Sequence, residues 1–200
     1  MKKLFQNQKN KNLWQAIKPW AMVIALFLIL RYTGALSGIS LLTNKALLET
    51  GALDASADEL NTTETFDFNF ELTTLSGDVV DFTSFKGKTI FINLWATWCG
   101  PCRVEMSSIQ ELYDQVDRNK VAFVMLSLDA PTHTKKVETF VKEKQYTFPV
   151  YRPHGPLNEA LNVNSIPTTL VISPEGKIVS RKVGAANYGT AKFKKFLEGL

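Results

Sequence analysis

Continuous apolar stretches and periodic ones alternate along the second half of the chain. Residues 89–95 and 121–128 are almost entirely apolar, which is typical of strands buried on both faces of a sheet. Between these stretches, apolar residues recur at helical spacing, at Met106, Ile109, Leu112, Tyr113 and Val116. A strand, a helix and a second strand in this order require a parallel pair joined by a right-handed crossover.

Shorter elements are predicted on both sides of this unit. Apolar and polar residues alternate in one predicted strand, whose apolar positions are Phe66, Phe68, Phe70 and Leu72. A turn at 76–77 and a short strand at 79–80 complete a hairpin. The remaining predicted elements are a helix over 135–144, a hairpin of strands 169–173 and 177–182, and a helix over 192–200. The sequence therefore predicts an α/β fold with a mixed central sheet, helices on both faces and an extra N-terminal β-hairpin.

The start of the chain has a different pattern, in which a lysine-rich stretch is followed by an unbroken apolar run at 20–30. As a helix the run would be about 16 Å long, against a hydrocarbon core of about 30 Å, and its length is that of a signal-peptide core. A span that continued to residue 42 would place Arg31 near the middle of the membrane. That placement costs about 2.5–3.5 kcal/mol unless the side chain snorkels.

Two interpretations of this segment stay open. One is an uncleaved signal anchor with Trp20 and Tyr32 at the membrane interfaces, and the other is a signal peptide cleaved near the small residues at 35–37. A buried core helix fits poorly, because the run is apolar all round. The domain organisation we expect is a basic cytoplasmic tail (1–19), a signal anchor or transmembrane segment (20–42), a linker (43–63) and a folded domain (64–200). The lysines place that domain on the extracytoplasmic (periplasmic) side.

Charge and composition exclude several classes of function. Residues 1–31 carry six basic residues and no acid, so the basic character of the chain comes from its start, and the remainder has a net charge of −2. We therefore expect no nucleic-acid partner. With 2 Cys and 2 His, the chain lacks the residues of a disulfide-rich scaffold or a cysteine-rich zinc module. We expect no metal and no cofactor.

The two cysteines lie in a Trp-Cys-Gly-Pro-Cys segment, residues 98–102, where a buried strand leads into a helix. The unpaired N–H groups and the dipole of a helix N-terminus favour a thiolate, which makes Cys99 a nucleophile near neutral pH. Cys102 lies on the same helix face, while Gly100 permits a tight turn and Pro101 fixes φ for helix entry. A purely structural disulfide across two residues would constrain the unfolded chain very little. The segment predicts redox catalysis.

The segment Trp-Ala-Thr-Trp-Cys-Gly-Pro-Cys at 95–102, with Ile166 and Pro167 some 65 residues later, resembles the thioredoxin superfamily. Within that superfamily, the chain resembles the membrane-anchored, extracytoplasmic TlpA/ResA-type thiol:disulfide reductases. Three features carry this closer resemblance: the Gly87–Lys88 turn, Glu105 and the N-terminal hairpin. The resemblance implies a redox disulfide between Cys99 and Cys102, client proteins with disulfides, and a membrane-embedded dithiol electron donor. It also implies a cis Pro167 packed against the cysteines. Trp98 is expected to form a flat surface beside Cys99.

The resemblance also bears on the proton that the reaction moves. Thioredoxins carry a buried Asp six residues before the first cysteine, and Asn93 stands there in this chain. The TlpA/ResA type depends instead on the Glu after the motif, which matches Glu105. We expect Glu105 to transfer a proton or to tune a thiol pKa, the alternative being an ordinary exposed helix residue. His133 and His154 are expected to be solvated loop residues.

Two other functions compete with a reductase. Peroxiredoxins place Thr three and Pro seven residues before their reactive cysteine, and Ala96 and Ile92 stand at those positions. A copper-binding assembly module of similar fold would require a wider cysteine spacing and a distal histidine. Neither alternative matches the cysteine segment as well as a disulfide reductase does.

Overall fold

A computed structural model of the chain describes residues 19–20, 22, 24, 54–55 and 64–200. The chain divides into two compact units, Met1–Ala46 and Leu47–Leu200. In the first unit Trp20, Met22 and Ile24 are helical and exposed, and the rest of the expected anchor at 20–42 lies outside the described residues. Within the described part of the chain, no helix has the length and apolar character needed to cross a membrane.

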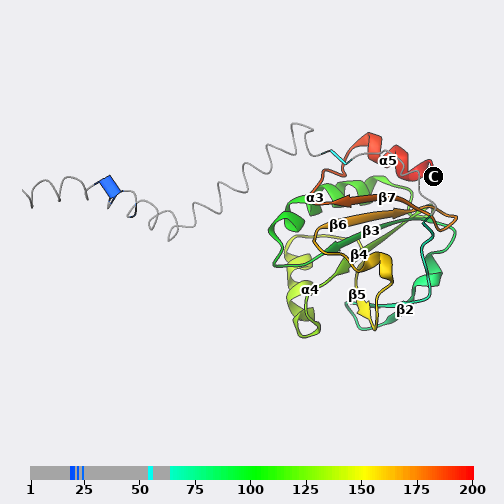
Figure 1. Ribbon diagram of the computed structural model, residues 1–200, viewed down its shortest axis with the longest axis horizontal. Coiled ribbons are helices and arrows are strands. Elements are labelled where there is room, and N and C mark those ends of the chain that lie inside the picture. Colours follow the sequence, from blue (N-terminus) through cyan, green and yellow to red (C-terminus); the bar gives the residue numbers. More distant parts are fainter. Residues whose placement is uncertain (1–18, 21, 23, 25–53, 56–63) are drawn as a thin grey trace, which may run out of the picture. The chain divides into compact units, whose positions relative to one another are not determined.

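The second unit is built on one seven-stranded sheet in the order β2-β1-β5-β4-β3-β6-β7 (Figure 1). Strand β3 pairs in parallel with β4 and β4 with β5, whereas the outer pairs are antiparallel, so the predicted mixed sheet is confirmed. The strands are β1 (Glu71–Thr74), β2 (Val79–Asp81), β3 (Thr89–Trp95), β4 (Val121–Ser127), β5 (Val150–His154), β6 (Thr168–Ile172) and β7 (Ile178–Val183).

The three α-helices of this unit all pack on one face of the sheet, which corrects the expectation of helices on both faces. They are α3 (Gly100–Gln115), α4 (Thr134–Glu143) and α5 (Ala191–Glu198), and each contributes to one core cluster, through Met106, Val137 and Phe193 respectively. The connections β3-α3-β4 and β4-α4-β5 step in the same direction across the sheet. Because both crossovers are right-handed, both helices lie on the same face.

The opposite face is covered by the segment before β3 and by two short 3₁₀ helices, η1 (Phe82–Phe85) and η3 (Glu159–Leu161). The strand predicted around Phe66 begins only at Glu71. Residues Phe66 and Phe68 are buried as the alternation indicates, but the Phe66 N–H donates to the carbonyl of Gly176 and not to a neighbouring strand (2.8 Å). The alternating pattern therefore identified core residues correctly and their secondary structure incorrectly.

Phe82 lies at the centre of this second core. Its side chain is fully buried, and its ring stacks on Phe70 with centroids 4.4 Å apart. We expect Phe82→Ala to lower the free energy of unfolding by about 3–5 kcal/mol, because the truncation leaves a cavity among rings that cannot collapse onto it. Urea denaturation measures the loss. Val79→Ala, at a position 51% exposed, is the control and should cost under about 0.5 kcal/mol. Equal losses in both variants would contradict this assignment of the core.

Strand β5 was not predicted, and it changes the position of His154. The strand reads Val-Tyr-Arg-Pro-His, pairs with β4 at two positions only, and is half-buried along most of its length. His154 ends β5 and is not in a loop as expected, although it is exposed, with its Nδ1 2.9 Å from the Thr73 hydroxyl. His133 is exposed at the end of η2 (Pro131–His133).

Candidate active site

The cysteines lie where the carboxyl end of β3 passes into α3. Cys99 is the N-cap of α3, and its Sγ accepts a hydrogen bond from the backbone N–H of Cys102 at 3.2 Å. The two residues form a disulfide, in which Cys102 is fully buried and Cys99 is 5% exposed. Only Cys99 can therefore be approached from solvent, which suits it to the attacking role that the sequence predicts.

The other residues of the predicted site surround Cys99. Gly100 and Pro101 open α3, and Trp98 is 64% exposed beside Cys99 in the chain. The Ile166 carbonyl oxygen lies 3.8 Å from Cys99 Sγ, and the Ile166–Pro167 peptide bond is cis. The structure thus brings these predicted residues together around the disulfide, and their catalytic roles remain predictions.

The loop that carries Cys99 is fixed by a buried carboxylate that the sequence analysis missed. Asp129 follows β4 and accepts hydrogen bonds from the backbone N–H of Thr97 at 2.8 Å and from its hydroxyl at 2.6 Å. The Ser127 hydroxyl donates to the same carboxylate at 3.0 Å. The sequence signal for Asp129 was its position, because it is an acidic residue that follows a buried strand. These hydrogen bonds fix the backbone at Thr97, two residues before Cys99.

Glu105 is fully buried, so the alternative of an exposed helix residue is wrong. Its Oε1 accepts a hydrogen bond from Asn93 Nδ2 at 2.7 Å, and its Oε2 accepts one from the backbone N–H of Ala186 at 3.1 Å. Burial raises the pKa of Glu105 to about 8, and the two hydrogen bonds offset part of that rise. The carboxyl group is therefore mostly protonated at neutral pH.

The surroundings of Glu105 come from three distant parts of the chain. Asn93 lies on β3 and also donates to the Thr169 hydroxyl on β6 at 2.9 Å. Tyr188 is buried in the loop before α5, and its backbone N–H donates to Ser108 at 3.1 Å. Burial, together with the nearby charge of Glu105, raises the pKa of Tyr188 above its usual value. The sequence had singled out Asn93 but gave no signal for Thr169 or Tyr188.

The geometry favours thiol chemistry in which the buried carboxyl group of Glu105 can hold or release a proton. Cys102 and Glu105 are three residues apart on the buried side of α3, a spacing that brings side chains together. An acid whose pKa is near that of a thiol exchanges protons with it at little cost in free energy. Within the described residues, no group of three or more His, Cys, Asp or Glu side chains is placed to hold a metal ion.

Comparisons with known proteins show the family of the chain. The model of the AhpC/TSA family matches residues 67–181. The thiol-disulfide oxidoreductase ResA of Bacillus cereus is 35% identical over 117 residues, which cover 58% of this chain and 66% of that relative, just under two thirds. The thioredoxin-like protein YneN of Bacillus subtilis (strain 168) is 31% identical over 169 residues, which cover 84% of this chain and 91% of that relative.

Among solved structures, the chain is similar to a thiol:disulfide interchange protein of the thioredoxin family from Chlorobium tepidum TLS. The TM-score is 0.59 with 25% sequence identity, and the match covers 70% of this chain and 98% of that one. The thioredoxin-like α/β fold that the cysteine segment implies is therefore confirmed.

Proposed function

The chain belongs to the AhpC/TSA family of thioredoxin-like proteins, and from that premise we propose that it is a thiol:disulfide oxidoreductase that reduces disulfides in client proteins. The observation that carries the proposal is the Cys99–Cys102 disulfide at the start of α3, in which Cys99 keeps a 5% exposed fraction and Cys102 is fully buried. The resemblance to ResA, which is named a thiol-disulfide oxidoreductase, supports it.

The reaction starts from the reduced dithiol. The Cys99 thiolate attacks one sulfur of the client disulfide, and the other client sulfur leaves as a thiolate. Cys102 then loses its proton and attacks the Cys99 sulfur, which releases the second client thiolate and leaves the Cys99–Cys102 disulfide. The client gains two electrons and two protons, and a dithiol donor must return two electrons before the next turnover.

Within this sequence of steps, Glu105 handles the proton of Cys102. Resolution requires a buried thiol to lose its proton, and Glu105 is the buried titratable carboxyl one turn along α3. The hydrogen bonds from Asn93 and Ala186 hold the carboxyl group in place and stabilise its ionised form.

A peroxidase fits the site less well than a reductase. Ile92 and Ala96 occupy the positions where peroxiredoxins carry Pro and Thr, and both are fully buried apolar residues without a hydroxyl group. A coupled assay separates the two functions. The full-length protein should reduce insulin disulfides in the presence of dithiothreitol, and consumption of hydrogen peroxide at a comparable rate would favour the peroxidase.

We also propose that the domain is tethered to a membrane and lies outside the cytoplasm, where a membrane-embedded dithiol carrier supplies its electrons. The proposal rests on the six basic residues before residue 32 and on the apolar run at 20–30. Disulfides persist outside the cytoplasm, so this location suits a protein whose two cysteines form a disulfide.

The tether can be tested by fractionation of cells that express the full chain. Carbonate-washed membranes should retain the protein, and Leu26→Arg should release it, because a charge in the apolar run opposes membrane insertion. Lys120→Arg, in the folded domain, is the control and should stay with the membranes. A soluble wild-type protein whose N-terminus lies near Gly38 would show that the segment is cleaved.

A further inference from the structure

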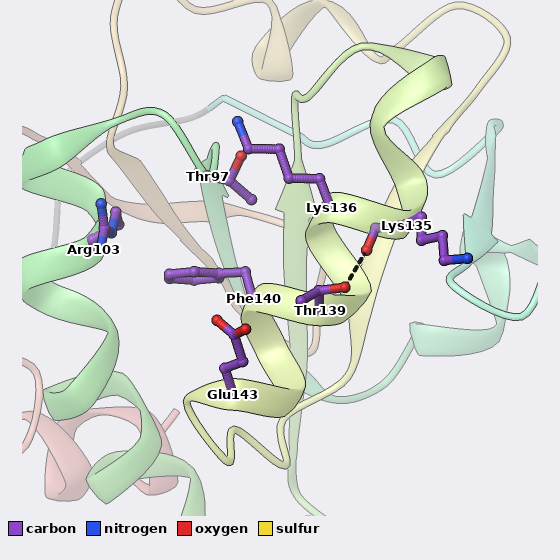
Figure 2. A pocket seen from close by; sticks show the side chains of 7 residues that line it. All are labelled: Thr97, Arg103, Lys135, Lys136, Thr139, Phe140 and Glu143. Carbon is purple, nitrogen blue, oxygen red and sulfur yellow. Dashed lines mark hydrogen bonds between the residues drawn. The ribbon is translucent and has the colours of Figure 1, made fainter.

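An open cavity of about 430 Å³ lies between α3 and α4 (Figure 2). We call it the cationic groove, and the residues that line it are Thr97, Arg103, Lys135, Lys136, Thr139, Phe140 and Glu143. Thr97 precedes Cys99 by two residues, and Arg103 directly follows Cys102. The groove therefore begins at the loop and helix that carry the two cysteines.

Aromatic rings and a guanidinium group form one wall of the groove. The ring of Phe140 packs against the buried Trp95, with centroids 5.7 Å apart, and the Arg103 guanidinium lies 5.6 Å from the Phe140 centroid. In Figure 2 the Lys136 side chain extends from α4 toward Thr97, whereas Lys135 points away from the groove. Arg103 and Lys136 thus supply positive charge on the two sides of the groove.

Among the described residues, this positive charge is only partly offset. Glu143 is the acid among the lining residues, and across residues 64–200 the side chains of Arg103, Lys135 and Lys136 form no ion pair or side-chain hydrogen bond. The nearby Asp129 carboxylate is buried and already accepts three hydrogen bonds, from Thr97 and Ser127. An anionic ligand would therefore meet cations whose hydrogen-bonding groups are free.

Helix stability does not explain these lysines. Lys135 and Lys136 occupy the first turn of α4, which has no acidic residue and no side-chain cap. Cations at a helix N-terminus are electrostatically unfavourable, because the helix dipole is positive at that end. Their position is better explained by an interaction outside the folded chain.

We propose that the cationic groove binds an acidic segment of the client polypeptide, with Asp or Glu side chains a few residues from the client cysteine; this inference rests on the proposed reductase function. A client sulfur must reach Cys99, so the client chain on one side of that sulfur passes Thr97 and enters the groove. The planar guanidinium of Arg103 matches the two oxygens of a carboxylate, and Lys136 adds a second cation.

The test uses two synthetic peptides that contain the same intramolecular disulfide and differ only in three flanking residues, Asp in one and Asn in the other. The reduced full-length protein should reduce the acidic peptide with a kcat/KM about fivefold higher, since two partly exposed charge contacts each give a modest gain. At an ionic strength of about 0.5 M the difference should shrink to less than about twofold, because salt screens exposed charges.

Charge reversal localises the effect. In the double variant Arg103→Glu, Lys136→Glu the ratio of the two kcat/KM values should fall to about one or below. The matched control is Lys120→Glu, directly before the amino end of β4 and so at the opposite end of the parallel strands from the cysteines, which should keep the wild-type ratio. A cysteine-free acidic peptide should raise the KM of wild-type protein for the acidic substrate and not that of the double variant.

The outcomes separate this inference from the proposed function. A wild-type protein that reduces both peptides equally well, or a double variant that keeps the wild-type ratio, overturns the groove assignment and leaves the reductase function intact. A wild-type protein that reduces neither peptide overturns both. Circular dichroism of the double variant establishes that it is folded, so a changed ratio reports on recognition.

Discussion

Replacement of Cys99 by serine is expected to abolish disulfide reduction, whereas replacement of Cys102 should stop the reaction one step later. Cys99 carries the sulfur that a client can reach, and serine has no sulfur with which to form a mixed disulfide, so the first step is blocked in Cys99→Ser. In Cys102→Ser the first attack still occurs, but the resolving thiol is absent. The mixed disulfide between Cys99 and the client should therefore accumulate.

Insulin reduction with dithiothreitol measures the turnover of both variants, and mass spectrometry under non-reducing conditions detects the trapped client. Ser107→Ala is the matched control, because Ser107 is an exposed residue on the same helix whose hydroxyl donates to the Val104 carbonyl one turn back and not to a residue of the site. It should keep the activity of the wild type. Full turnover by Cys99→Ser would refute the assignment of the nucleophile and, with it, the proposed mechanism.

The central strands and the cysteine segment could be predicted because their signals are local. Strand β3 has the bounds read from the sequence, and β4 differs by one residue, since a continuous apolar run between turns has few other structures available. The N-cap position of Cys99 follows from a strand, a Gly-Pro pair and a helical pattern in succession. None of these inferences required knowledge of contacts between distant segments.

The missed features depend on such distant contacts. Strand β5 contains Pro153 and the charged Arg152, and it forms because β1 and β4 pair with it from both sides. That unpredicted strand also decides which face α4 covers. The same limit applies to the linker expected at 43–63, of which the described residues Asp54 and Ala55 pair with Asn187. Local composition carries no sign of that pairing.

The burial of Glu105 also depends on contacts between distant segments, and it has the larger consequence for the site. Spacing placed it one turn from Cys102, but only the fold brings Asn93 and Ala186 over its carboxyl group. A substitution of Glu105 is therefore a change in the core. Glu105→Gln should affect both stability and the proton step, each with its own pH dependence.

The stability of the oxidised wild type should fall as the pH rises from about 5 to about 8. The pKa of Glu105 is about 8 in the folded protein and near 4.5 when unfolded, so in this window the folded state holds a proton that the unfolded state has released. The cumulative loss is on the order of 5 kcal/mol. Below the window both states are protonated, and above it both are ionised, so the stability no longer changes with this group.

Urea denaturation of the oxidised protein at several pH values measures this effect, with Glu105→Gln as the variant that cannot titrate. At about pH 5 the variant should be less stable by about 1–3 kcal/mol, because its amide N–H meets another donor. Above about pH 8 it should be more stable than the wild type. Glu111→Gln, at an exposed position on α3, is the control and should follow the wild-type curve. Parallel curves for wild type and Glu105→Gln would contradict the raised pKa.

The kinetic consequence concerns resolution by Cys102 more than attack by Cys99. In the wild type, the rate of mixed-disulfide resolution should rise as Glu105 ionises near pH 8, because the carboxylate then accepts the thiol proton. Glu105→Gln should lower this rate and remove its rise near pH 8. Alkylation of Cys99 in the reduced protein should change less. Stopped-flow oxidation of both proteins across about pH 5 to 10 separates the two steps. Superimposable profiles would mean that the proton of Cys102 leaves by another route, and Glu105 would then be a buried structural acid.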